Sequence, residues 1–197
     1  MKKNIYYSLL ISAMVSVSAA EETRQVDKHE HGVGELNIAI EGNAIDFEFF
    51  IPGADIVGFE YEAKTESDIA LVNAALEKFG NFDNIFSLPE SSNCNLVNSE
   101  IGVNQDDDHD DHDEHDDHDD HDEHDDHDEH DEEAHNEFVA HYSFNCENIK
   151  EIDRISFPYF TNFPNSGELE VQFVSEKGST GFEVEGDEPF IDLKGKI

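Results

Sequence analysis

Positive charge is scarce in this chain of 197 residues, which has 11 lysines and arginines against 49 aspartates and glutamates. The formal net charge is −38 at pH 7. A chain this acidic repels nucleic acids and anionic lipid surfaces and attracts cations. We therefore expect divalent metal ions as ligands and no nucleic-acid partner.

Long apolar runs are also missing, apart from one over residues 5–17. That run follows a basic start at 1–3 and precedes the small residues 18–20. A membrane anchor is the alternative, but a spanning helix needs about 20 apolar residues. The order is typical of a signal peptide cleaved near Ala20. We expect an exported, periplasmic protein with residues 21–197 as a single metal-binding domain, not inserted in the membrane after cleavage.

The common catalytic signatures are absent. The sequence contains no GxSxG, no HExxH and no phosphate-binding glycine loop. A catalytic zinc site would need a general base beside an open coordination position, and Glu30 is the one local candidate. We therefore expect a binding protein and not an enzyme.

Only two cysteines are present, Cys94 and Cys146. In an oxidising compartment an even pair usually forms a disulfide. We expect such a bond to join the two sides of the charged insert described below. For a loop of this size, the chain-entropy relation gives a stabilisation of about 4 kcal/mol. The alternative is a metal site with two cysteine ligands.

Apolar alternation predicts strands over most of the remaining chain. The predicted strands cover residues 35–40, 44–51, 95–103, 136–146, 152–159, 168–175, 181–185 and 190–193. Gly42-Asn43 favours a hairpin between the first two. One clear helix is predicted over 67–79, with Thr65 or Ser67 as its cap and Gly80 after its end. The fold class is therefore α+β, a mainly antiparallel sheet with one or two helices, interrupted by a disordered insert rich in His and Asp.

That insert, residues 106–133, consists only of Asp, Glu and His. Its histidines recur at every third position, at His109, His112, His115, His118, His121, His124, His127 and His130. Imidazole suits zinc, copper and nickel, whereas carboxylates alone suit calcium or magnesium. With no apolar residue to bury, the insert should be disordered without metal. We expect several weak Zn²⁺ sites that exchange ligands; the alternative is a solvating acidic tract.

Four further histidines lie next to predicted strands. His29 and His31 precede the first strand, and His135 and His141 share one face of the strand after the insert. The first pair could meet His135 or His141 across the sheet and form a site of three or four ligands. The alternative is that all four are exposed polar residues.

The stretch 29–38, His-Glu-His-Gly-Val-Gly-Glu-Leu-Asn-Ile, is followed by Glu-Gly-Asn at 41–43 and by Phe-Ile-Pro-Gly-Ala-Asp-Ile-Val-Gly-Phe-Glu at 50–60. This pattern resembles the ZrgA-like family of periplasmic zinc-regulated proteins, and the resemblance continues through the helix and the insert to Cys146. It implies a zinc-binding accessory to a high-affinity zinc ABC importer, with the importer's periplasmic binding protein as a partner. In the family a histidine often follows Gly-Phe-Glu, whereas this chain has Tyr61.

The sequence therefore predicts a periplasmic zinc-binding protein that supports zinc acquisition and holds several Zn²⁺ ions per chain. A buffer or resistance protein for copper, nickel or cobalt is the main alternative, because ligand type alone does not separate these metals. A structural or adhesion module with a solvating insert is the third.

Overall fold

The structure is a computed structural model that describes residues 32–105 and 135–197. The predicted signal peptide, His29, His31 and the insert 106–133 lie outside these residues. In chain order the elements are β1 (Val33–Glu41), β2 (Ala44–Pro52), α1 (Gly53–Val57), α2 (Glu66–Phe79), β3 (Cys94–Gln105), β4 (Asn136–Cys146), β5 (Arg154–Ser156), α3 (Tyr159–Asn162), β6 (Glu168–Ser175), β7 (Gly178–Glu185) and β8 (Phe190–Asp192). Three short 3-10 turns occur at Phe82–Asn84, Glu90–Ser92 and Ile149–Glu151.

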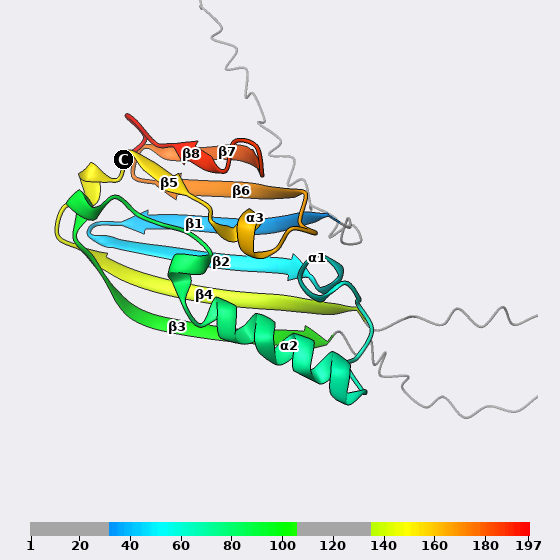
Figure 1. Cartoon of the computed structure of the whole chain (residues 1–197). Coiled ribbons are helices and arrows are strands. Elements are labelled where there is room, and N and C mark those ends of the chain that lie inside the picture. The colour runs from blue at the N-terminus through cyan, green and yellow to red at the C-terminus, as the bar shows by residue number, and fades with distance from the viewer. Residues whose placement is uncertain (1–31, 106–134) are drawn as a thin grey trace, which may run out of the picture.

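Six strands form one twisted sheet in the order β3-β4-β2-β1-β6-β7 (Figure 1). Neighbouring strands are antiparallel except β1 and β6, which pair in parallel with Val33 beside Glu168. β5 and β8 form a separate antiparallel pair. The predicted mainly antiparallel sheet is confirmed, and the parallel pair at its centre is an addition that local sequence patterns did not indicate.

The predicted hairpin between β1 and β2 is confirmed. Glu41 pairs with Ala44, so Gly42 and Asn43 make a two-residue turn. Gly42 has φ of 59°, a left-handed conformation that glycine adopts without a steric penalty. β2 ends at Pro52, because Gly53 begins the short helix α1.

The sheet is buried on one face only. Leu36 and Ile38 of β1 are almost inaccessible, while the preceding Glu35 is exposed. On the buried face, Phe79 of α2 stacks on Phe138 of β4 and on Phe163, just after α3. Figure 1 shows α2, α3 and the β5–β8 pair in front of this face. The other face, which we call the open face, has polar side chains, and no strand of the large sheet contains a lysine or arginine.

The predicted helix corresponds to α2, and its cap is Thr65, whose Oγ1 accepts the Asp68 N–H at 3.2 Å. Gly80 follows the helix but keeps a right-handed conformation. α1 and α3 raise the number of α-helices in the described ranges to three, where one or two were predicted. The predicted strand 152–159 shortens to β5 (Arg154–Ser156), and Pro158 is the N-cap of α3. Neither short helix is long enough to produce a helical apolar period.

Cys94 and Cys146 form a disulfide, as predicted. They lie directly opposite each other in the β3–β4 pair, with their Cα atoms 3.9 Å apart. The other end of the same pair joins Gln105 to Asn136. The disulfide therefore closes the β3–β4 pair at the end remote from the insert. Among residues 32–105 and 135–197, no helix has the length and apolar character that crossing a membrane requires.

Candidate metal centre

Four strand ends lie together at one end of the sheet. β1 begins there at Val33, β2 ends at Pro52, β3 ends at Gln105 and β4 begins at Asn136. Gln105 pairs with Asn136, and Pro52 pairs with Glu137. In Figure 1 the arrowheads of β2 and β3 point to this end, which we call the insert end.

His135 lies at the insert end, one residue before β4. Its Nδ1 atom is 2.7 Å from Oε2 of Glu60. The imidazole is 56% exposed, whereas the Glu60 side chain is only 13% exposed. A carboxylate that binds one ring nitrogen fixes the ring and its tautomer, and it leaves the other nitrogen to bind a metal. Nε2 of His135 is therefore the nitrogen that can reach a metal ion.

Asn136 holds Glu60 in place. Its backbone N–H donates to the carbonyl oxygen of Glu60 at 2.7 Å, and its side-chain amide donates to the carbonyl of Tyr61 at 2.9 Å. Asn136 is itself buried and packs against Gly53, where a Cβ atom would collide with its side chain. The segment that carries Glu60 is thus fixed against the start of β4.

Gly32 is held from two sides at the same end of the sheet. Its N–H donates to Oδ1 of Asp55 at 2.9 Å. Its carbonyl oxygen accepts the N–H groups of Gly167 and Glu168 at 2.9 and 2.8 Å. Gly32 is therefore fixed at the insert end, beside the start of β6.

The start of β1 and the start of β4 are two strand positions apart, with β2 between them. Two spacings of about 4.8 Å place them about 10 Å apart. Histidine side chains on both segments can span such a gap to one ion, since a zinc–nitrogen bond adds about 2 Å on each side. The start of β1 is therefore within reach of an ion bound by His135.

His141 lies elsewhere. It is six residues beyond His135 on one extended strand, so their Cα atoms are about 20 Å apart at about 3.4 Å per residue. Its Nε2 is 3.7 Å from Oδ1 of Asp46, and it lies opposite Glu48 and Glu100 on the open face. The structure does not bring His135 and His141 together, and of the two only His135 lies at the insert end.

Within residues 32–105 and 135–197, no three side chains of His, Cys, Asp or Glu already converge on a position for a metal ion. The predicted ligands His29 and His31 and the eight insert histidines lie outside those ranges. Sequence reasoning missed Glu60, Asn136 and Asp55. Asp55 and Glu60 left a signal, because both belong to the stretch 50–60 that resembles the family pattern. The partner of Glu60, His135, is 75 residues away.

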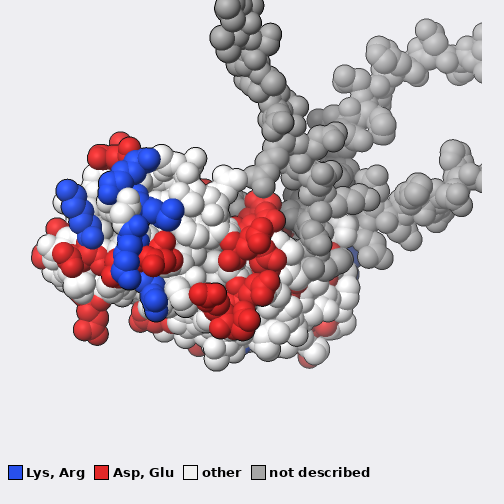
Figure 2. Space-filling view, turned by 90° about the horizontal axis from the view of Figure 1, so that it is seen from above, with Lys and Arg blue, Asp and Glu red and all other residues white. Residues whose placement is uncertain are grey.

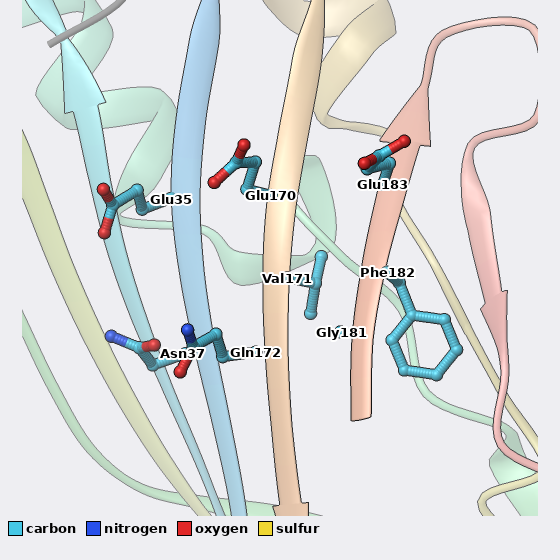
Figure 3. A pocket seen from close by; sticks show the side chains of 8 residues that line it. All are labelled: Glu35, Asn37, Glu170, Val171, Gln172, Gly181, Phe182 and Glu183. Carbon is cyan, nitrogen blue, oxygen red and sulfur yellow. The ribbon is translucent and has the colours of Figure 1, made fainter. Parts of the chain in front are cut away.

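Charge is distributed unevenly over the molecule. On the open face, Glu35, Glu170 and Glu183 lie side by side in register on β1, β6 and β7, around a shallow depression (Figure 3). Figure 2 shows a band of acidic side chains across the middle of the molecule and most basic side chains gathered toward its left end. Neighbouring like charges destabilise a sheet and strengthen the local negative potential, which attracts cations.

The chain matches a known protein family. No curated protein matches the chain. The sequence pattern of the ZrgA family of zinc uptake proteins matches residues 28–193, from the residue before His29 to Leu193 just after β8. This match covers most of the chain and confirms the resemblance found in the sequence. The chain therefore belongs to the ZrgA family of zinc uptake proteins.

Proposed function

We propose that this member of the zinc uptake family is an exported, periplasmic zinc-binding protein that delivers zinc to a high-affinity ABC importer and catalyses no reaction. In this proposal His29, His31 and His135 hold one zinc ion tightly at the insert end. The insert histidines collect further ions and exchange them with that site.

The proximity of three histidine-bearing segments supports this proposal. Gly32 follows His29 and His31, Asn136 follows His135, and Gln105 and Asn136 flank the insert; all three described residues lie at the insert end. Segments that are remote in the sequence therefore begin or end in one region of the described structure. If these histidines were only exposed polar residues, nothing would require the sheet to bring these segment ends together.

The chemistry at this end suits zinc. Three imidazole nitrogens occupy three tetrahedral positions, and the fourth is available to water or to a histidine of the insert. Glu60 orients the ring of His135, as carboxylates do for zinc-bound histidines. A site with one exchangeable position can take zinc from a weaker site and release it again.

The attachment of the insert supports transfer. Because Gln105 and Asn136 are paired, both ends of the insert are tethered beside His135. Tethering raises the effective concentration of the weak sites around the tight one and makes exchange intramolecular. The acidic residues of the insert raise the local concentration of cations in the same region.

Zinc calorimetry on the full chain, in a buffer that does not chelate, tests the tight site. We expect several ions per chain in two affinity classes, and loss of the tight class in His29→Gln/His31→Gln and in His135→Gln. His141→Gln is the matched control, since it removes one histidine from the same strand about 20 Å away. If the His29→Gln/His31→Gln variant still binds its tight zinc ion as the wild type does, the proposal is wrong.

Induction of the protein separates uptake from the alternative role in resistance to copper, nickel or cobalt. An accessory of zinc import is needed when zinc is scarce, so zinc starvation should raise its level in the cell. Induction by excess copper, nickel or cobalt, with no response to zinc starvation, would favour the resistance role.

A further inference from the structure

β3 is an outer strand of the large sheet, and in the described ranges β4 is the one strand that pairs with it. Figure 1 shows β3 along the lower border of the sheet. Every residue from Asn95 to Glu100 is exposed. The outer side of β3 therefore presents a row of backbone N–H and C=O groups with which another strand can pair.

The edge formed by β3 has little protection against such pairing. Proteins usually protect an edge with lysine, proline, inward-pointing charges, a bulge or a very short strand. β3 is 12 residues long, contains no lysine, arginine or proline, and has Glu100 as its one charged residue. The register with β4 shifts at Val97, which is a bulge, but it is regular from Asn98 to Gln105. Most of β3 is therefore available as a regular edge.

β7, the strand at the opposite edge, is better protected. Glu183 and Glu185 place two negative charges on its eight residues, and Gly181 weakens it as a strand. β8 lies beside it. The Nζ atom of Lys196 lies 5.4 Å from the centre of the Phe182 ring, so a positive charge also stands near this edge. The two edges differ, and β3 is the one suited to pairing.

Exposed apolar side chains gather beside the β3 edge. Six large apolar side chains are exposed in the described ranges, and four of them belong to β3 or to α2. α2 contacts β3 and is drawn in front of it in Figure 1. The four are Ile69 and Leu71 of α2 and Leu96 and Val97 of β3, of which Val97 is the most exposed at 69%. Burial of such side chains would stabilise a new strand pair, which is only marginally stable in water by its hydrogen bonds alone.

We propose that β3 pairs antiparallel with β3 of a second copy of the chain, so that the two six-stranded sheets form one continuous sheet. A two-fold axis gives each backbone donor of one strand the matching acceptor on the other, which makes the edge complementary to itself. A chain with a net charge of −38 repels its own copies at most surfaces, and the β3 edge, with one acidic residue, opposes their contact least. This inference does not depend on the proposed zinc site.

The regular part of β3 favours one register for the pair. Ile101 is the middle residue of the stretch from Asn98 to Asn104, so a two-fold axis beside Ile101 uses the whole stretch. Glu100 then lies opposite Gly102 of the second copy, which avoids two like charges facing each other. Space is available there, because a Cβ atom on Gly102 would meet nothing within 4 Å. Asn98 lies opposite Asn104 of the second copy, where the two side-chain amides can form hydrogen bonds.

Sedimentation of the full chain at micromolar concentrations tests this pairing, with a chelator present so that no metal ion bridges two copies. The wild type should dimerise, and more tightly at high salt than at low salt, because salt screens the repulsion between two acidic chains. Asn98→Lys/Asn104→Lys places two lysines opposite each other at two points, so the dimer Kd should rise about tenfold. This rise is expected although the lysines reduce the net negative charge. Both positions are exposed, so the variant should fold, which circular dichroism measures.

Two further variants serve as controls. Asn98→Lys/Asn104→Asp places a lysine opposite an aspartate at both points, so the Kd should return to about that of the wild type. Ser179→Lys adds a lysine at an exposed position of β7 and should not weaken the dimer. A monomeric wild type, an unchanged dimer in Asn98→Lys/Asn104→Lys, or no recovery in Asn98→Lys/Asn104→Asp would overturn the proposal. Equal weakening by Ser179→Lys would also overturn it, since the effect would not be specific to β3.

Discussion

Glu60 and His135 are 75 positions apart in the sequence, yet Oε2 of the one lies 2.7 Å from Nδ1 of the other. The carboxylate is largely shielded from solvent and the imidazole is mostly exposed. The shielded partner is therefore the fixed one, and the exposed partner is oriented by it. This geometry leaves Nε2 of His135 as the ring nitrogen that is available to a ligand.

Glu60→Ala should weaken the tight zinc site by about 10- to 100-fold, because an unanchored imidazole must be ordered when the metal binds. Competition calorimetry on the full chain measures this change. Glu62→Gln is a suitable control, since Glu62 lies two residues away, is half exposed and pairs with Lys64 at the surface. Equal affinities of Glu60→Ala and wild type would remove Glu60 from the site.

Sequence patterns predicted those parts of the fold that depend on residues close together in the chain. The hairpin at Gly42 follows from its turn and flanking alternation, and β4 follows from five inward residues at period two. The parallel pairing of β1 with β6 was not predictable in this way. It joins Val33 to Glu168 across more than half of the chain, and no turn or short loop specifies it.

The candidate zinc site was also only partly predictable from the sequence. Residue type alone singled out His29, His31 and His135 as candidate ligands, but it ranked His141 equally with them. Distance along β4 separates His135 from His141, and only the fold shows that Gly32 begins β1 at the same end of the sheet as His135. Glu60 contacts the ring of His135 through its side chain, and Asn136 and Asp55 contact backbone groups; no spacing in the sequence specifies these contacts.

Deletion of residues 106–133 should leave a folded domain that binds about one zinc ion. The described core is complete without the insert, and Gln105 and Asn136 already face each other across β3 and β4. Circular dichroism of the deletion variant shows whether it folds, and calorimetry measures its zinc binding. A folded variant with no zinc binding would show that the insert supplies all of the metal ligands.

Replacing both Cys94 and Cys146 with serine should lower stability and leave zinc binding unchanged. The chain-entropy relation gives about 4 kcal/mol for a loop of this size, which corresponds to a fall of roughly 10 °C in melting temperature. The disulfide lies at the opposite end of β3 and β4 from His135, so zinc calorimetry should not change. Loss of the tight class in a folded variant would indicate coupling along the strand pair.

Alkaline pH should destabilise the fold through Tyr142. Its hydroxyl donates to the Phe79 carbonyl at 2.6 Å, and burial raises the pKa of the phenol. Above pH ~10 the unfolded chain releases this proton and the folded chain keeps it, so Tyr142 lowers the free energy of unfolding by about 1.4 kcal/mol per pH unit. Burial also raises the pKa of Tyr159, which adds a contribution of the same sign. Urea unfolding at pH 8 to 11 measures the slope. Tyr142→Phe should be less stable at pH 8 but show a shallower decline above pH 10.

Mild acid should release zinc from the full chain. A histidine must be neutral to bind metal, and imidazole has a reference pKa of about 6.5, so protons and zinc compete for the same nitrogens. Carboxylates behave differently, since they stay ionised to pH ~4. Equilibrium dialysis at pH 7.5 and 5.5 in fixed salt, on the full chain and on the insert peptide alone, separates the two ligand types. Strong loss at pH 5.5 in both samples is expected if histidines hold the metal. Equal retention at both pH values would mean that the acidic residues hold it, and the assignment of zinc to the histidines would be wrong.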